Sequence, residues 1–118
     1  MNGGALYFTY GFGKNYDITN NTFTNWTAVT GGAIQNMDQV LNLRDNFFYN
    51  NTAENLVGGD NEIETFGDGG AIYNTWETPN WGSTFTNNVF SGNEAHHDGG
   101  AVKYIGLEPS GLKDNNTL

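Results

Sequence analysis

The tetrapeptide Gly31-Gly32-Ala33-Ile34 decides the fold, because the chain contains three more copies of the same motif. The other copies are Gly3-Gly4-Ala5-Leu6, Gly69-Gly70-Ala71-Ile72 and Gly99-Gly100-Ala101-Val102. The copies are separated by 28, 38 and 30 residues, a range of periods that is typical of a solenoid. Paired glycines allow a tight bend and present no Cβ to a neighbouring turn. We therefore expect each motif to begin a short strand in a stacked coil.

A second motif accompanies the first and places an asparagine two residues before an aromatic residue. Its three full copies are Asn21-Thr22-Phe23, Asn46-Phe47-Phe48 and Asn88-Val89-Phe90, and Asn116-Thr117-Leu118 begins a fourth. Asparagine tolerates the left-handed backbone of a sharp corner, and its amide can pair with backbone groups there. Since the motif recurs at the same place in each repeat, we expect Asn21, Asn46, Asn88 and Asn116 to form a ladder of amides.

One repeat can be written as a coil of short strands. A strand from Ala33 to Asn36 follows the diglycine, a second runs from Leu41 to Arg44, and a third runs from Phe48 toward Ala53. This layout predicts an all-β parallel β-helix with about four rungs (turns of the coil) and three short strands per rung. Each rung should add one residue to each of three interior columns. The columns are Leu6, Ile34, Ile72 and Val102; Ile18, Leu43 and Phe85; and Phe23, Phe48, Phe90 and Leu118.

The repeats also predict the domain organisation. Residues 1–118 should form a single repeat array, with repeats that start near residues 3, 31, 69 and 99. The chain opens at the start of one repeat and ends inside another, so we expect either a slice of a longer solenoid or a self-stacking unit.

Composition excludes several classes of function. The formal net charge is −9 with only four basic residues, so nucleic acid is not an expected partner. No run of apolar residues approaches the length that spans a bilayer, and the chain has no cysteine for a disulfide, a thiolate metal site or a thiol nucleophile. We expect no cofactor, apart from a possible Ca²⁺ ion.

Four acidic residues are candidate ligands for such an ion. Asp60 and Glu62 lie in the insertion 54–68, which is rich in the oxygen ligands that a hard cation prefers. Asp68 and Asp98 each precede a diglycine, so adjacent rungs should stack them about 5 Å apart. Two carboxylates at that separation can bind Ca²⁺ or act as an acid/base pair. The alternatives are a solvated acidic loop for the first pair and hydrogen bonding to turn amides for the second.

The neighbouring histidines suggest a transition-metal site less strongly. His96 and His97 are adjacent on an extended segment, so their side chains should point to opposite faces and not share one ion.

Catalytic machinery is scarce in this sequence. The only arginine is Arg44, and Lys14, Lys103 and Lys113 are scattered over different repeats. No Ser/His/Asp set and no phosphate-binding loop is present. We therefore predict that the protein is not an enzyme and assign no catalytic residue.

Two further features bear on surface display. Asn-x-Thr sequons, which are acceptors for N-glycans in eukaryotic secretory proteins, occur at Asn20, Asn25, Asn50 and Asn115. A second insertion, 75–82, contains Trp76 and Trp81, which can stack on sugars or wedge a loop onto the coil. In solenoids such insertions tend to gather on one face, often the binding face.

Taken together, the two motifs make the chain resemble the GGA[ILV]/FxxN repeats of the chlamydial polymorphic outer-membrane proteins and similar large surface proteins. Phe48-Tyr49-Asn50-Asn51 and Phe90-Ser91-Gly92-Asn93 fit FxxN in full, whereas Phe23-Thr24-Asn25-Trp26 has its asparagine one place early. The resemblance implies a right-handed β-helix displayed outside the cell, in a structural or adhesive role.

These features predict an extracellular or cell-surface structural protein, the repeat unit of a stalk, surface layer or filament. The expected partner is an adjacent repeat or a second copy of the chain, with cell-surface glycans or proteins as candidates for an adhesive role. The alternative is a carbohydrate-active β-helix enzyme of the polysaccharide lyase or glycosidase type.

Overall fold

Short strands alternate with corners and loops, and every strand pairs with strands from other repeats rather than with its neighbour in sequence. The computed structural model describes residues 4–8, 14–37, 39–54, 67–75 and 83–105. These residues contain thirteen strands and no helix. All the pairings are parallel, so the chain winds as a parallel β-helix.

The strands fall into four sheets, and each sheet takes one strand from each rung. The first sheet has the order β1-β5-β9-β13, with strands Leu6–Phe8, Ile34–Met37, Ile72–Thr75 and Val102–Ile105. The second has the order β10-β6-β2, with strands Thr84–Thr86, Val40–Arg44 and Asn15–Thr19. The third has the order β11-β7-β3, with strands Val89–Ser91, Phe47–Tyr49 and Thr22–Thr24. The fourth has the order β12-β8-β4, with strands Glu94–Ala95, Thr52–Ala53 and Thr27–Ala28.

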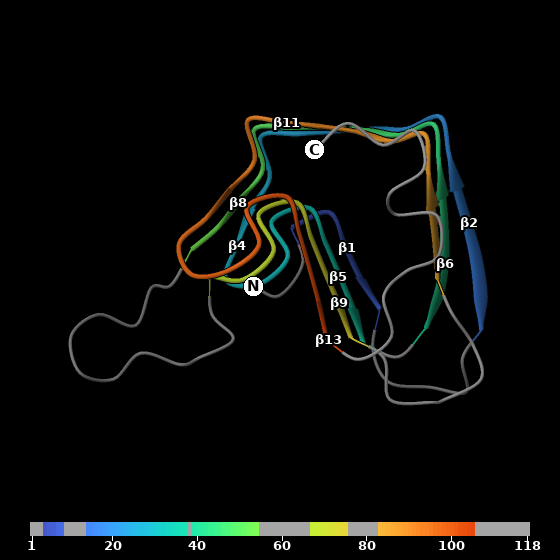
Figure 1. Cartoon of the computed structure of the whole chain (residues 1–118), viewed down its shortest axis with the longest axis horizontal. Coiled ribbons are helices and arrows are strands. Elements are labelled where there is room, and N and C mark those ends of the chain that lie inside the picture. Colours follow the sequence, from blue (N-terminus) through green and yellow to red (C-terminus); the bar gives the residue numbers. More distant parts are fainter. Residues whose placement is uncertain (1–3, 9–13, 38, 55–66, 76–82, 106–118) are drawn as a thin grey trace.

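Three complete rungs and the first strand of a fourth are described, which agrees with the expected number of about four. Figure 1 shows the rungs superimposed, with β2 and β6 on the right, β11 along the top and β4 and β8 on the left. One detail differs from the sequence prediction, because each complete rung has four strands and not three. The predicted third strand is divided by a second corner, so that β7 ends at Tyr49 and β8 begins at Thr52.

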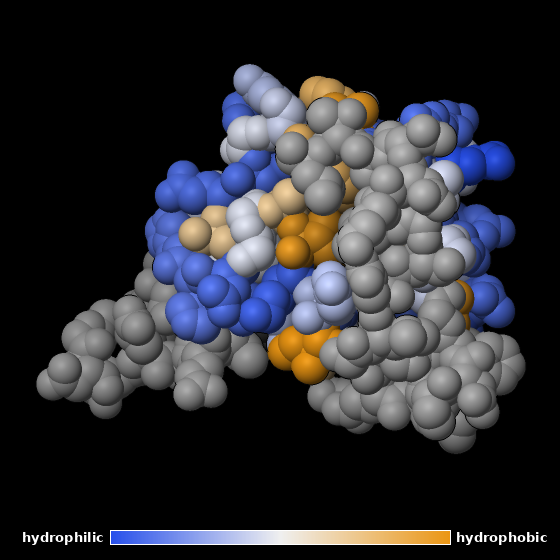
Figure 2. Space-filling view, in the orientation of Figure 1, coloured by the Kyte–Doolittle hydropathy of each residue, from blue (hydrophilic) through white to orange (hydrophobic). Residues whose placement is uncertain are grey.

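The three interior columns are confirmed wherever they are described. Ile34 pairs with both Leu6 and Ile72, and Val102 pairs with Ile72. Leu43 lies between Ile18 and Phe85, and Phe48 lies between Phe23 and Phe90. The rings of Phe48 stack on both neighbours with centroids 4.8 Å apart. Leu118 lies outside the described residues. In Figure 2, hydrophobic residues are visible in the middle of the described part and at its upper edge, and hydrophilic residues gather on its left and right sides.

The two glycines of each motif serve different needs. The first adopts a left-handed backbone, with φ of 61°, 68° and 71° at Gly31, Gly69 and Gly99. The second needs space, since a Cβ on Gly32 would lie 2.0 Å from the Gly70 carbonyl oxygen of the next rung and 2.7 Å from the Thr52 nitrogen. The motif therefore brings the start of the first sheet against the fourth sheet, backbone to backbone.

Candidate functional site

The densest cluster of ionisable groups lies where two rungs meet, just before the third and fourth diglycines. Asp68 is buried in the turn that leads into Gly69, and His97 and Asp98 lie in the equivalent turn of the next rung. One ligand atom from each of these three side chains lies within 4.8 Å of the others. The stacking of adjacent rungs therefore brings Asp68 and Asp98 together, as their positions before the diglycines predicted.

Direct hydrogen bonds hold the cluster. The His97 Nδ1 and Asp68 Oδ1 atoms are 2.6 Å apart, and the Asp98 backbone N–H donates to the same oxygen at 3.0 Å. The hydrogen bond from the His97 imidazole to Asp68, reinforced by the charge of that carboxylate, raises the pKa of His97 above its ordinary value. Lys103 donates to Asp98 Oδ2 at 3.1 Å, and this hydrogen bond with its charge lowers the pKa of Asp98.

The donor set bears on the expected metal site. Ca²⁺ takes six to eight oxygen ligands, whereas this cluster offers two carboxylates and an imidazole nitrogen. Asp68 is also the acceptor of a backbone amide, which is the contact that the turn-forming alternative describes. Asp60 and Glu62 lie outside the described residues, so a cation site that includes them stays a prediction. The two histidines diverge, since His96 Nε2 lies 3.5 Å from Glu94 Oε1 while His97 faces Asp68.

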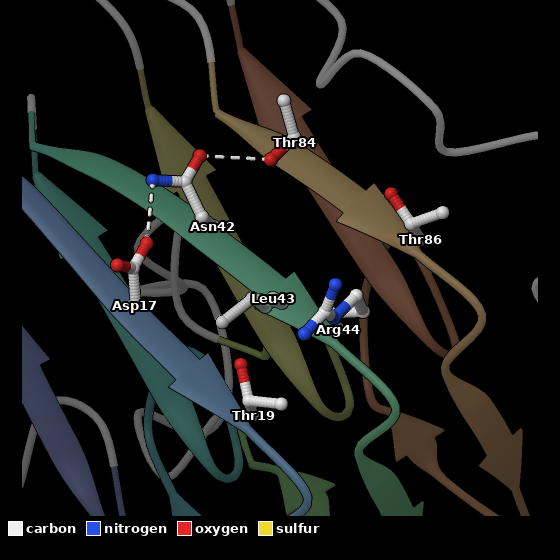
Figure 3. Close-up of a pocket in the computed structure, with 7 residues that line it drawn as sticks. All are labelled: Asp17, Thr19, Asn42, Leu43, Arg44, Thr84 and Thr86. Carbon is white, nitrogen blue, oxygen red and sulfur yellow. Dashed lines mark hydrogen bonds between the residues drawn. The ribbon is translucent and has the colours of Figure 1, made fainter.

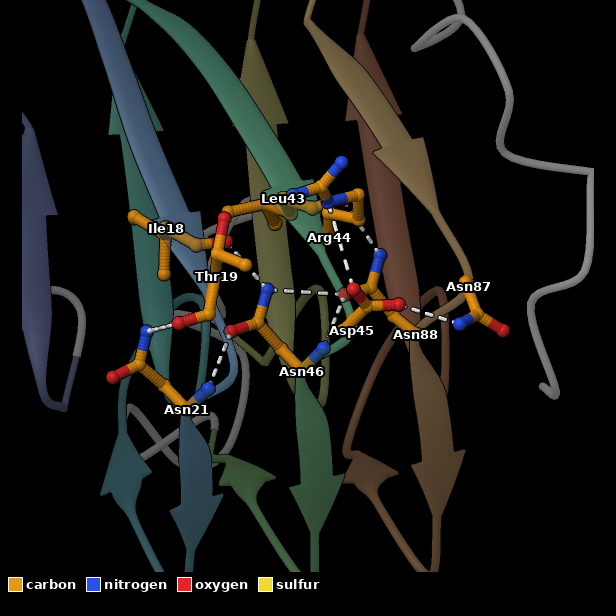
Figure 4. Close-up of polar contacts among 9 residues, drawn as sticks. All are labelled: Ile18, Thr19, Asn21, Leu43, Arg44, Asp45, Asn46, Asn87 and Asn88. Atoms are coloured by element: carbon orange, nitrogen blue, oxygen red, sulfur yellow. Dashed lines mark hydrogen bonds and ion pairs between the residues drawn. The ribbon is translucent and has the colours of Figure 1, made fainter.

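The predicted asparagine ladder is present at the corner between the second and third sheets. Asn46 donates to Asn88 Oδ1 both from its backbone N–H, at 3.0 Å, and from its side-chain Nδ2, at 3.1 Å. The backbone N–H of Asn21 donates in the same way to Asn46 Oδ1, at 3.0 Å (Figure 4). Each amide also donates to the rung before it, Asn46 to the Ile18 carbonyl and Asn88 to the Leu43 carbonyl. Each of these asparagines thus provides a hydrogen-bond donor for a backbone carbonyl at the corner of the preceding rung. Asn116 lies outside the described residues.

Asn21 differs from the other members because the described residues include no rung before it. Its Nδ2 turns back to the Thr19 carbonyl of its own rung, at 3.0 Å, and the side chain is exposed (Figure 4). Asn46 and Asn88, by contrast, are buried. Asn21 is therefore the first member of the ladder among the described residues.

A second ladder lies at the corner that divides the predicted third strand. Asn51 donates from its backbone and from Nδ2 to Asn93 Oδ1, both at 2.9 Å, and Trp26 donates from its backbone to Asn51 Oδ1 at 3.1 Å. This ladder was not predicted from the sequence, although Asn51 and Asn93 are the final asparagines of the two complete FxxN motifs. The signal was obscured because a tryptophan takes the equivalent place in the first rung.

The sequon asparagines lie at these corners, immediately before the ladder positions. Asn20, Asn25 and Asn50 have φ of 60°, 61° and 54°, and all three are exposed. The residue two places later begins the next strand in each case, as Thr22, Thr27 and Thr52 do. The conformation of the corner is thus sufficient to explain the Asn-x-Thr sequences here, because the left-handed position favours asparagine and the start of a strand favours threonine. Glycosylation stays a prediction, and Asn115 lies outside the described residues.

Comparison with known families adds one decisive match. Residues 47–75 match the family model described as the Chlamydia polymorphic membrane protein (Chlamydia_PMP) repeat. Residues 47–75 are thus similar to a polymorphic membrane protein repeat. The matched segment begins at β7, includes Asn51 of the second ladder and ends with β9, so it holds one FxxN motif and one diglycine motif in that order. The resemblance seen in the sequence is confirmed for this repeat. The searches of curated proteins and of solved structures found no match.

By its description, the matched repeat type comes from a family of membrane proteins. In the described ranges, no helix combines the length and the apolar character needed to cross a membrane.

Proposed function

We propose that this chain is an extracellular structural segment of a β-helical surface protein, in which rungs stack end to end to build a stalk, layer or filament. The family match supports the surface location, because the repeat type takes its description from a membrane protein family. The proposal assigns the chain no reaction. The insertions 54–68 and 75–82 are its candidate adhesive contacts, and residues 55–66 and 76–82 of them lie outside the described residues.

The observation that carries the proposal is the position of Asn21, the first member of the asparagine ladder among the described residues. In the rungs that follow, each corner amide bonds to a carbonyl of the preceding rung. The side-chain amide of Asn21 donates instead to the Thr19 carbonyl of its own rung, at 3.0 Å, and this side chain is exposed. An incoming rung would offer this amide the partner that Asn46 already has. The partner that fits is a preceding repeat or a second copy of the chain, since both present the same corner.

This proposal is tested by measuring self-association. Sedimentation velocity over a range of concentrations, with electron microscopy of the same samples, should show end-to-end oligomers of the unmodified chain. Asn21→Ala should shift association to higher concentration, because the ladder cannot continue. Asn15→Ala is the matched control, since Asn15 is also exposed in the first rung and takes no part in the ladder. A chain that stays monomeric at all concentrations, or equal association of the two variants, would contradict the proposal.

A further inference from the structure

A groove lies on the outer face of the second sheet, next to the first asparagine ladder, whose amides donate to the carbonyls of Thr19 and Leu43 in the groove lining. It has a volume of about 360 Å³ and crosses all three strands β2, β6 and β10 (Figure 3). Its lining residues are Asp17, Thr19, Asn42, Leu43, Arg44, Thr84 and Thr86. A volume of this size falls within the range of pockets that hold small ligands.

The polar side chains of the groove form two rows that run across the strands. In the first row, Asn42 donates to Asp17 Oδ1 at 3.0 Å and accepts from the Thr84 hydroxyl at 2.8 Å. In the second row, the strand register places Arg44 between Thr19 and Thr86. Because successive strands are successive rungs, both rows follow the direction in which the rungs stack.

The charges of the groove disfavour an anionic ligand. Arg44 is the only cation of the lining, and its Nε lies 3.5 Å from the carboxylate of Asp45. Asp17 is the one carboxylate of the lining, and Asp45, although outside the lining, already pairs with the one base. The whole chain carries a formal net charge of −9, which adds to the repulsion.

The polar groups that line the groove are suited to binding the hydroxyl groups of a ligand. A carboxylate, an amide, a guanidinium and three threonine hydroxyls line the groove, and together they supply both donors and acceptors. The Arg44 side chain is 68 % exposed, so its planar donors are accessible to a ligand. Hydroxyl groups of a sugar can both donate to Asp17 and accept from Arg44, whereas an apolar ligand does neither and an ionised carboxylate or phosphate group only accepts. We infer that this groove binds a neutral saccharide, with the sugar chain lying along the rungs between the two rows.

The test is titration of the whole chain with neutral oligosaccharides of glucose, mannose and galactose, and with uronate oligosaccharides of equal length, followed by calorimetry or NMR. Binding of a neutral member is expected. Thr84→Val removes the hydroxyl that donates to Asn42 with little change in shape, and Arg44→Gln removes the guanidinium from an exposed side chain. Each should weaken binding about tenfold, as expected for the loss of a good hydrogen bond.

Thr22→Val is the matched control, because Thr22 is an exposed strand threonine on the adjacent third sheet, outside the groove lining. It should leave binding unchanged, and Arg44→Gln keeps the test valid if Thr84→Val does not fold. Absence of binding in the millimolar range, a preference for uronates, or equal binding by all variants would overturn the inference. Self-association is a separate measurement, so failure here is distinguishable from failure of the stacking proposal.

Discussion

At the scale of single residues, the second glycine of each of the first three motifs is required by its neighbours across the rungs. Gly32 and Gly70 each face the carbonyl oxygen of the equivalent glycine in the next rung, at 2.0 Å from where a Cβ would lie. Real Cβ atoms do not approach backbone this closely, so a side chain there forces two rungs apart.

Gly70→Ala should therefore be strongly destabilising. The added methyl would also lie 2.8 Å from backbone atoms of Glu94, and relief requires movement of main chain rather than of a flexible side chain. We expect a loss of roughly 3 kcal/mol in the free energy of unfolding, measured by urea denaturation. Gly100→Ala is the matched control, since the nearest described atom there, the Asn93 carbonyl oxygen, is 3.9 Å away. Equal losses for both variants would contradict this account.

At the scale of elements, the turns before the diglycines are tied together by charge. His97 connects the turn of one rung to Asp68 in the turn of the previous rung, and its backbone N–H also donates to the Gly67 carbonyl at 3.0 Å. Asp98 and Lys103 are the other charged groups beside His97 that shift its pKa.

The raised pKa of His97 gives this contact a pH dependence. A group with a higher pKa in the folded state contributes stability that is full below its unfolded pKa and is lost as the pH rises through its folded pKa. The free energy of unfolding of the wild type should therefore exceed that of His97→Gln by more at pH 5.5 than at pH 8.5. Thermal melts across this range measure the difference. His96→Gln, which removes the imidazole that faces Glu94, is the control and should keep the wild-type profile.

Sequence patterns predicted those elements in which every rung needs the same kind of side chain at the same position. The aliphatic and phenylalanine columns recur at fixed offsets because each must fill the same interior space, and the Asn21, Asn46 and Asn88 ladder recurs for the same reason at a corner. The second ladder was missed because Trp26 interrupts it, and with it the extra corner that makes four strands per rung.

The groove could not be predicted in this way. Asp17, Asn42 and Thr84 point outward, where the fold places no common demand on successive rungs, so they form no repeating motif. The His97–Asp68 pair escaped prediction as well, because the diglycine motifs align Asp68 with Asp98, and His97 lies one residue before that equivalent position.

At the scale of the whole molecule, stability is approximately a sum of contacts between adjacent rungs. A residue in the middle rung therefore contributes to two interfaces, whereas its equivalent in the first rung contributes to one. The phenylalanine column shows the difference, since Phe48 stacks on both Phe23 and Phe90.

Phe48→Ala should consequently cost more than Phe23→Ala. Phe48 is fully buried and loses stacking on both sides, so we expect a loss of roughly 4 kcal/mol in the free energy of unfolding. Phe23 is 8 % exposed and has one stacking partner, so its loss should be smaller by about 1 kcal/mol or more. Chemical denaturation of the two variants side by side measures the order. A larger loss for Phe23→Ala would contradict a rung-by-rung sum.

The corner amides give the stack a direction. Asn46 and Asn88 each reach backward to complete the turn that was formed before them, and neither completes its own. The hydrogen bonds of each of these corners are consequently completed by the rung that follows it. An assembly made this way has two chemically different ends. A molecule that binds one end and blocks its growth would therefore not bind the other.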